Sequence, residues 1–395
     1  MSRIIHHPAV VSSRIGLLTI AVALIASGPA RAQTPITAAG LGYRIAPLDG
    51  RSAALGGTGL GLLGGTFSLV NPADLRAHLE PGFGLAFSGE SVSLKGGPGP
   101  LDSGRERFTV IRAVVPFDAW AVGLAFGGEF DQDWAVRFQD TLVLSDGKVP
   151  FEEARERDGG ISSIDVSVAR QLGPISLGVS AQRLNGSVRQ TFSRDFELSP
   201  DGAPQLSPTG DAERLSYRAW RFKAGGAVTL GDRLMLSAVA SFDGTLTSEP
   251  EDSTSATTTV DLPKSIQVGG SARLAQGLIV AASGGWAEWS VAGTVEDAIG
   301  HDITWMGAGL EYQRLRLLGG DLPVRVGVRR GELPFSLTAD AIEETALSFG
   351  FGWRFRNGLA VLSTAFEIGS RGDLAVDGLE ESFTRATISF ELRDR

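Results

Sequence analysis

The spacing between strand-like segments constrains this fold more than any other feature of the sequence. After roughly the first eighty residues, apolar and polar side chains alternate in about fourteen successive segments, the pattern of strands with one apolar face. The gaps between these segments are alternately short and long. The short gaps are turn signals: Phe117-Asp118, Gly173-Pro174, Gly231-Asp232, Gln276-Gly277, Gly319-Gly320-Asp321 and Asn357-Gly358. The long gaps are polar stretches at 95–104, 132–160, 189–214, 248–264, 292–302, 334–342 and 371–381.

This rhythm predicts an all-β protein, a transmembrane antiparallel β-barrel of about fourteen strands. Such barrels have tight turns at the periplasmic end and longer loops at the extracellular end. In segment 346–356 every second residue is large and apolar: Leu347, Phe349, Phe351, Trp353 and Phe355. The residues between them are small or charged. We therefore expect one face to contact lipid and the other to face the lumen, in the cell outer membrane.

The N-terminal end has the pattern of an export signal. Arg3 and Arg14 flank the start of an apolar run, Ile15–Ala26, and Ala30-Arg31-Ala32 matches a signal-peptidase site. Residues 1–32 are predicted to be removed, because this charge and length pattern is typical of a cleaved signal peptide. The chain has no cysteine, which excludes disulfides and thiolate chemistry. Its formal charge of −9 disfavours nucleic acid as a partner.

Residues 33–81 are predicted to plug the lumen. An eight-stranded barrel is filled by its own side chains, whereas about sixteen to eighteen strands leave an aqueous channel. A barrel of intermediate size has space that is either open or filled. The segment 33–81 is apolar and rich in glycine, so packing inside the barrel would hide it from water. The predicted division is a signal peptide at 1–32, a hatch at 33–81 and a barrel at 82–395.

Two motifs in the predicted plug resemble a known family. The first is Arg51-Ser52-Ala53-Ala54-Leu55-Gly56-Gly57, and the second is Asn71-Pro72-Ala73-Asp74-Leu75. Asn followed by Pro also forms an ordinary turn, so the second motif alone is a weak signal. Together, ahead of a predicted barrel, they resemble the N-terminal hatch of the FadL-type outer-membrane transporters for long-chain fatty acids and other hydrophobic compounds.

The resemblance implies a transport mechanism. A hydrophobic molecule would bind in an apolar lumenal pocket, the hatch would move, and a kink in the third strand would open a lateral path through the wall. The third predicted strand is 119–131, and its kink candidates are Gly127 and Gly128. Glycine within a strand often marks a bulge or bend. Close packing of these small residues against the hatch is the alternative interpretation.

A fatty-acid carboxylate would need cations, which form its strongest hydrogen bonds. The candidates on lumen-facing positions are Arg221, Lys223, Arg273 and Arg325. Acidic residues on the same face could equally neutralise them. The expected partners are hydrophobic small molecules, outer-membrane lipids including lipopolysaccharide, and the barrel-assembly machinery.

Three alternatives remain at this stage. A PorV-like barrel that serves protein secretion has a similar hatch, and a general diffusion porin has a similar barrel. An enzyme is disfavoured because the mature chain keeps two histidines, His78 and His301, neither of which lies in a recognisable catalytic motif. We expect no catalytic residue, metal or cofactor. The long gap 132–160 is unusually apolar, and Ala135–Leu144 could add a strand pair, form a lid or capture ligand.

Overall fold

The computed structural model describes residues 34–96, 101–144, 147–196, 206–251, 256–317, 320–355 and 358–394. The predicted signal peptide and the turn residues Gly319 and Asn357 lie outside these ranges. Fourteen antiparallel strands form a closed barrel, in which β2 pairs with both β3 and β23. These strands are β2 (Gly82–Lys95), β3 (Leu101–Phe117), β4 (Trp120–Asp131), β6 (Gly147–Leu172), β7 (Ile175–Phe196), β8 (Thr209–Leu230), β9 (Leu234–Asp243), β12 (Ser265–Ala275), β13 (Leu278–Ala287), β16 (Ile303–Tyr312), β19 (Val324–Glu332), β21 (Glu343–Phe355), β22 (Ala360–Arg371) and β23 (Glu380–Arg393).

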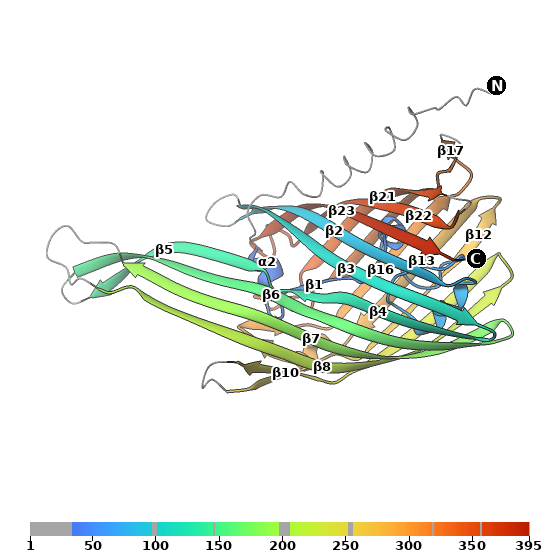
Figure 1. Ribbon diagram of the computed structural model, residues 1–395. Coiled ribbons are helices and arrows are strands. Elements are labelled where there is room, and N and C mark those ends of the chain that lie inside the picture. Colours follow the sequence, from blue (N-terminus) through green and yellow to red (C-terminus); the bar gives the residue numbers. More distant parts are fainter. Residues whose placement is uncertain are drawn as a thin grey trace, which may run out of the picture.

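The tight turns lie together at one end of the barrel, on the right in Figure 1. Asp118, Gly173, Gly231 and Gly277 have positive φ angles there, the conformation that short hairpin turns require. The predicted fourteen-stranded barrel and its alternation of short and long connections are therefore confirmed by the strand pairing.

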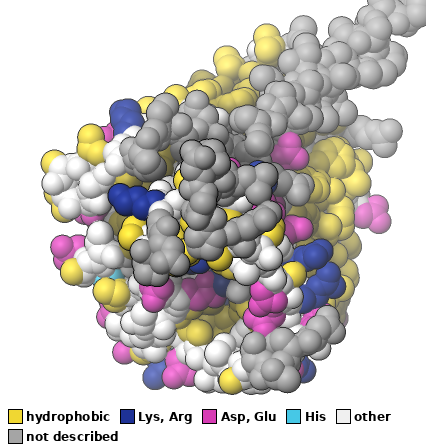
Figure 2. Space-filling model, turned by 90° about the vertical axis from the view of Figure 1, so that its left-hand side faces the viewer, with side chains coloured by type: hydrophobic (Ala, Val, Ile, Leu, Met, Phe, Trp, Pro, Cys, Tyr) yellow, Lys and Arg dark blue, Asp and Glu magenta, His cyan; other side chains and the backbone are white. Residues whose placement is uncertain are grey.

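The outer surface of the wall is apolar. Outward side chains such as Leu124, Val179 and Met306 are 57%, 59% and 65% exposed, although they are large and apolar. This is the band that a barrel presents to lipid. Seen from the loop end, charged side chains of both signs surround the mouth and hydrophobic ones run along the flank (Figure 2). Among the described residues, no helix combines the length and apolar character needed to cross a membrane.

Several predicted loops are strand extensions. β6, β7 and β8 contain 26, 22 and 22 residues, more than a tilted strand needs to cross the hydrocarbon. β5 (Trp134–Leu144) pairs with β6, and these strands project beyond the barrel at the left of Figure 1. The interpretation of 132–160 and 189–214 as polar loops was therefore wrong over much of their length. The alternative of an added strand pair is correct, although β5 lies outside the fourteen-stranded wall.

Smaller elements occupy the loop end. They are β10 (Thr245–Pro250), β11 (Thr258–Asp261), η2 (Trp289–Ala292), β14 (Thr294–Val295), β15 (Ala298–Gly300) and β20 (Phe335–Ser336). At the opposite end, β17 (Arg316–Leu317) pairs with β18 (Gly320–Asp321).

The hatch lies inside the barrel, shown in blue in Figure 1. It contains α2 (Pro35–Ala38), β1 (Tyr43–Arg44), α3 (Gly50–Ala54) and η1 (Pro72–Ala77). Its leucines Leu55, Leu60 and Leu75 are 0–1% exposed, so the apolar character of the segment is explained by burial. α3 contacts β19, β21, β22 and β23, whereas η1 contacts β6, β7 and β8. The plug therefore reaches opposite sides of the wall.

Candidate functional site

Arg51 of the first hatch motif anchors the plug to the wall. Its Nε and Nη2 atoms donate to the two carboxylate oxygens of Glu311 on β16 at 2.9 and 3.0 Å. Its Nη1 atom also donates to the Gly65 carbonyl at 2.8 Å. Glu311 is fully buried and receives a further bond from Arg325 Nε at 2.7 Å. A buried carboxylate needs such charged donors, because its desolvation is costly without them.

Asn71 of the second motif joins the hatch to β8 and β9. Its Oδ1 atom accepts from the Ala73 backbone N–H at 2.9 Å, which caps η1. Its Nδ2 atom donates to Ser237 Oγ at 2.6 Å and to the Ala238 carbonyl at 3.2 Å. Pro72 occupies the first turn of η1, where its missing N–H costs nothing. The motif therefore forms a capped turn fixed to the wall.

Asp74 and His78 are buried titratable groups of the same hatch segment. Asp74 accepts from the Gly61 N–H at 2.8 Å and from Ser237 Oγ at 2.7 Å. Burial raises the pKa of Asp74 to about 6. Burial lowers the pKa of His78 to about 4, and its Nε2 atom lies 3.0 Å from the Thr66 carbonyl. His78 is therefore neutral at pH 7 and donates to that carbonyl.

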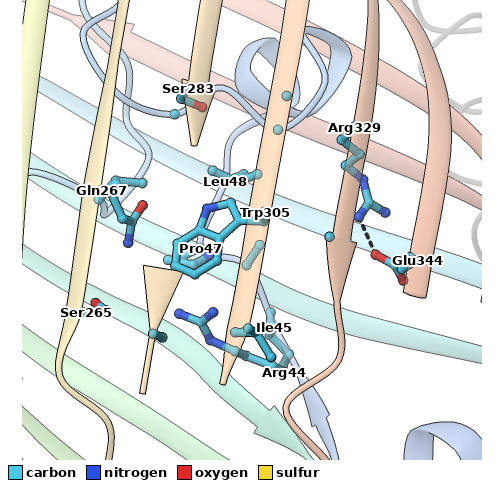
Figure 3. A pocket seen from close by; sticks show the side chains of 18 of the residues that line it. Arg44, Ile45, Pro47, Leu48, Ser265, Gln267, Ser283, Trp305, Arg329 and Glu344 are labelled. Carbon is cyan, nitrogen blue, oxygen red and sulfur yellow. Dashed lines mark hydrogen bonds and ion pairs between the residues drawn. The ribbon is translucent and has the colours of Figure 1, made fainter. Parts of the chain in front are cut away.

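A cavity of about 240 Å³ lies between the hatch and the wall (Figure 3). Its apolar lining comes mainly from the hatch and from two tryptophans: Ile45, Pro47, Leu48, Leu60, Leu69, Trp289 and Trp305. Its polar lining includes Ser265, Gln267 and Ser283 on β12 and β13. Small-molecule sites combine an apolar lining with a few convergent polar groups in this way.

Two cations without acidic partners face this cavity. The Arg44 guanidinium lies 5.7 Å from the centroid of the Trp305 ring, beside Ile45 and Pro47 in Figure 3. Burial lowers the pKa of Arg44, and the like charge of Arg221 lowers it further. Lys223 Nζ donates to the Leu69 carbonyl at 3.2 Å. Within the described part of the chain, neither cation has a carboxylate oxygen at ion-pair distance.

The four predicted head-group residues lie in different places. Arg221 and Lys223 line the cavity, but Arg221 forms ion pairs with Glu129 at 2.8 Å and Asp243 at 2.6 Å. Arg273 donates to the Asp232 carbonyl at 3.0 Å, at the turn end. Arg325 is bound to Glu311. The structure thus brings Arg221 and Lys223 to the cavity and places Arg273 and Arg325 away from its lining.

Sequence reasoning missed Arg44. This residue belongs to a two-residue strand of the hatch, where no alternation of side chains indicates which way an arginine points. Its position depends on pairing with β4, which is a tertiary contact. The available signal was a cation directly before the apolar run Ile45-Ala46-Pro47-Leu48 of the plug.

The barrel wall is interrupted beside this cavity. Pairing of β3 with β4 runs from Phe117↔Trp120 to Val110↔Gly127 and then ends. Beyond that point the end of β4 pairs with the hatch, through Tyr43↔Asp131 and Arg44↔Phe130. In the described residues, the part of β3 before Val110 pairs only with β2.

Gly127 and Gly128 lie where the strands diverge. The β4–β6 register shifts between Gly128 and Phe130, so β4 has an irregularity directly after the two glycines. A Cβ atom on Gly128 would lie 2.7 Å from Ile45 Cδ1 and 2.8 Å from the Phe108 carbonyl oxygen. The bend and the close approach of the hatch therefore occur at the same place.

His301 has a serine neighbour, but the arrangement is structural. His301 Nε2 lies 2.8 Å from Ser336 Oγ. That hydroxyl is buried and is also 2.7 Å from the Thr338 carbonyl and 2.9 Å from the Asp340 carbonyl. A hydroxyl that donates to a carbonyl has no proton to give to a histidine base. The pair therefore fixes the turn after β20.

The fold and plug define a class, the hatch-plugged β-barrel channels. The sequence matches no protein-family model and no curated protein. The structure resembles a Pseudomonas aeruginosa FadL homologue (14% identity, TM-score 0.57, 88% of this chain and 98% of that chain). It also resembles two toluene transporters. TodX of Pseudomonas putida has 15% identity and a TM-score of 0.55, over 88% of this chain and 96% of that chain. TbuX of Ralstonia pickettii has 15% identity and a TM-score of 0.56, over 88% of this chain and 98% of that chain. At this identity the likeness defines the fold alone, a barrel of the kind found in the FadL-type transporters.

Proposed function

We propose that this protein is an outer-membrane uptake channel for hydrophobic molecules with an anionic head group, of which long-chain fatty acids are the first candidates. Residues 1–32 would direct export and be removed, and the barrel-assembly machinery would insert the chain among outer-membrane lipids and lipopolysaccharide. The hydrophobic cargoes named for the structural neighbours support the general class. The anionic head group is inferred from this chain's own cavity.

The observation that carries the proposal is that two cations without a carboxylate of the described residues at ion-pair distance, Arg44 and Lys223, line a partly apolar cavity. A buried charge without a partner costs several kcal/mol, on the order given by its desolvation. A carboxylate bound by Arg44 and Lys223 would supply the missing partner. The apolar hatch residues Ile45, Leu48 and Leu60 would hold the hydrocarbon tail.

The interrupted wall supports a lateral route out of this cavity. Arg44 belongs to the hatch strand that pairs with the end of β4. A ligand bound to Arg44 therefore touches the hatch segment that pairs with β4 just beyond Gly127 and Gly128. Hatch movement would change the cavity and the pairing of β4 together.

Ligand binding tests the proposal directly. Lipids that co-purify with the barrel are extracted and identified by mass spectrometry, and binding of a fluorescent fatty acid is then measured in detergent. Arg44→Ala and Lys223→Met are each expected to weaken binding by about tenfold, or about 1.4 kcal/mol. Arg273→Ala, a cation of the same charge at the turn end, is the matched control. Unchanged affinity in both cavity variants would remove the head-group site.

A general diffusion porin is the rival that the plug disfavours. Steady ion conductance in planar bilayers, together with recovery of no apolar molecule, would favour it over an uptake channel. Co-purification of a large exported protein would instead favour the PorV-like role in secretion.

A further inference from the structure

The break between β3 and β4 is closed by side chains instead of backbone pairing. Arg107 on the unpaired half of β3 donates from Nε to Asp131 Oδ2 on the end of β4, at 2.7 Å. The two side chains are only 4% and 11% exposed. A charge-assisted bond between nearly buried partners is stronger than one in water. This ion pair therefore takes the place of the missing backbone ladder.

A hatch residue supports the ion pair from the lumen. The Arg107 guanidinium lies 4.1 Å from the centroid of the Tyr43 ring, close enough for a cation–π interaction. Tyr43 is also the backbone partner of Asp131. Tyr43 thus contacts both members of the pair, one through its ring and the other through its main chain.

The neighbouring wall strands β22 and β23, on the other side of β2 from β3, fix Tyr43. Arg385 Nη2 donates to the Tyr43 hydroxyl at 2.6 Å, and Arg371 Nη2 does so at 3.3 Å. The Arg371 guanidinium also lies 4.7 Å from the ring centroid. The position of the ring therefore depends on β22 and β23 as well as on the hatch.

The closed arrangement leaves hydrogen-bonding groups unused. Along the inward face of the same half of β3, buried polar atoms of Ser103, Arg105, Arg107 and Thr109 have no hydrogen-bond partner. The Arg105 guanidinium lies near Glu90, at 3.4 Å, without a hydrogen bond. An unsatisfied buried polar group costs about 1–3 kcal/mol, so these atoms mark the part of β3 where the closed arrangement is least well satisfied.

We propose that Arg107 and Asp131 form an ionic gate across the lateral opening, and that Tyr43 is the positioning residue that keeps the gate closed. Displacement of the hatch withdraws the Tyr43 ring and the backbone partner of Asp131, which frees the end of β4 from β3. This inference rests on the proposed uptake function and adds the regulation of its exit.

Because the chain has no cysteine, a pair of introduced cysteines can be cross-linked selectively, and a reducible cross-link between β3 and β4 can be reversed. In Arg107→Cys/Asp131→Cys, the two thiols are joined by a short reducible thiol cross-linker. Cross-linking is expected to reduce fatty-acid uptake by cells at least tenfold, and reduction is expected to restore it. Ala113→Cys/Leu124→Cys joins cross-strand partners where β3 and β4 are already paired, so its cross-linking should leave uptake unchanged.

The result separates the gate from the channel itself. If the locked gate variant imports as fast as the control, the exit does not pass between these strands and the ionic gate is refuted, while ligand binding in the cavity still supports the channel. If the lock also abolishes binding in detergent, the lock has distorted the cavity and the inference is likewise refuted. Loss of the proposed function would appear differently, as absence of both binding and uptake in the unaltered protein.

Charge and ring variants test the roles of the three residues. Arg107→Gln and Asp131→Asn are each expected to increase the rate at which a thiol reagent labels Phe130→Cys by severalfold. The exchanged pair Arg107→Asp/Asp131→Arg is expected to restore slow labelling. Tyr43→Phe keeps the ring but loses the hydroxyl bonds to Arg371 and Arg385, so it should label at an intermediate rate, whereas Tyr43→Leu should label rapidly. Equal labelling rates in Tyr43→Phe and Tyr43→Leu would show that the ring does not position the gate.

Discussion

At the scale of single residues, the hatch contains two buried groups whose pKa values move in opposite directions. Asp74 has its pKa raised to about 6 and His78 has its pKa lowered to about 4, both by burial. The folded state thus binds a proton on Asp74 more readily than the unfolded chain does, and a proton on His78 less readily. Stability follows the difference in bound protons between the two states.

In the unaltered protein, the effects of Asp74 and His78 on the pH dependence of stability are expected to oppose each other. A variant that removes one of the two groups should reveal the effect of the other. Asp74 adds stability as pH falls from about 6 towards 4, whereas His78 removes stability as pH falls from about 6.5 towards 4, each by up to about 3 kcal/mol. Relative to the unaltered protein, Asp74→Asn should therefore lose stability between pH 7 and pH 4.5, and His78→Gln should gain stability over the same interval. Urea unfolding in detergent at the two pH values measures this. The same sign of change in both variants would contradict the assignment.

Glu311 gives a second prediction at this scale, because it neutralises two arginines at once. Glu311→Gln leaves Arg51 and Arg325 both unpaired, and loss of one partner of a buried pair costs about 3–5 kcal/mol. Arg51→Met leaves Glu311 still bound to Arg325, so it should be the milder change. Cleavage of the hatch by an added protease measures the release of the plug. Faster cleavage in Arg51→Met than in Glu311→Gln would contradict this ranking.

At the scale of elements, adjacent glycines of the first hatch motif have different surroundings. Gly56 has a φ of +70°, and a Cβ there would lie 2.4 Å from the Val328 carbonyl oxygen. Gly57 has a φ of +76°, but its nearest neighbour would be Arg329 Cδ at 3.5 Å. Both positions need glycine for their backbone conformation, but only Gly56 needs it for space.

Alanine substitution at the two positions should therefore differ. Gly57→Ala is expected to cost about 1–2 kcal/mol, the strain of a left-handed residue. Gly56→Ala adds a backbone collision with β19, so the hatch must shift and the loss should be clearly larger. Thermal unfolding of the two variants in the same detergent makes the comparison. Equal melting temperatures would mean that the contact with β19 does not constrain the hatch.

Sequence patterns correctly predicted the elements that depend only on residues close together in the chain. The wall strands alternate because one face meets lipid, and the turn at Phe117-Asp118 is a tight hairpin with Asp118 at a φ of 47°. The extensions of β6 and β7 were missed because polar and charged residues dominate them. Arg189, Gln190 and Thr191 therefore show no apolar alternation although they continue β7.

The site was predictable only in part, for the same physical reason. Lys223 could be assigned to the lumen because its strand alternates. Arg325 could not be excluded, because its partner Glu311 lies on β16 and only the β16–β19 register brings the two together. The ion pair of Arg107 with Asp131 depends on the end of β3–β4 pairing at Gly127, which no local pattern indicates.

At the scale of the whole molecule, the plug extends along the height of the barrel. Ile36 of α2 lies in an apolar cluster with Leu94 and Ile342, near the loop end. At the opposite end, Arg76 of η1 donates to the Trp120 carbonyl at 2.7 Å. The hatch then joins β2 through residues 78–81, a tether that spans at most about 14 Å when extended.

The position of β2 has a consequence for the placement of the plug. β2 follows the hatch directly and pairs with β23, the last strand. The barrel therefore closes where its first wall strand pairs with its last. The plug is tethered to β2 by residues 78–81, so the strand that closes the barrel also fixes where the plug enters it.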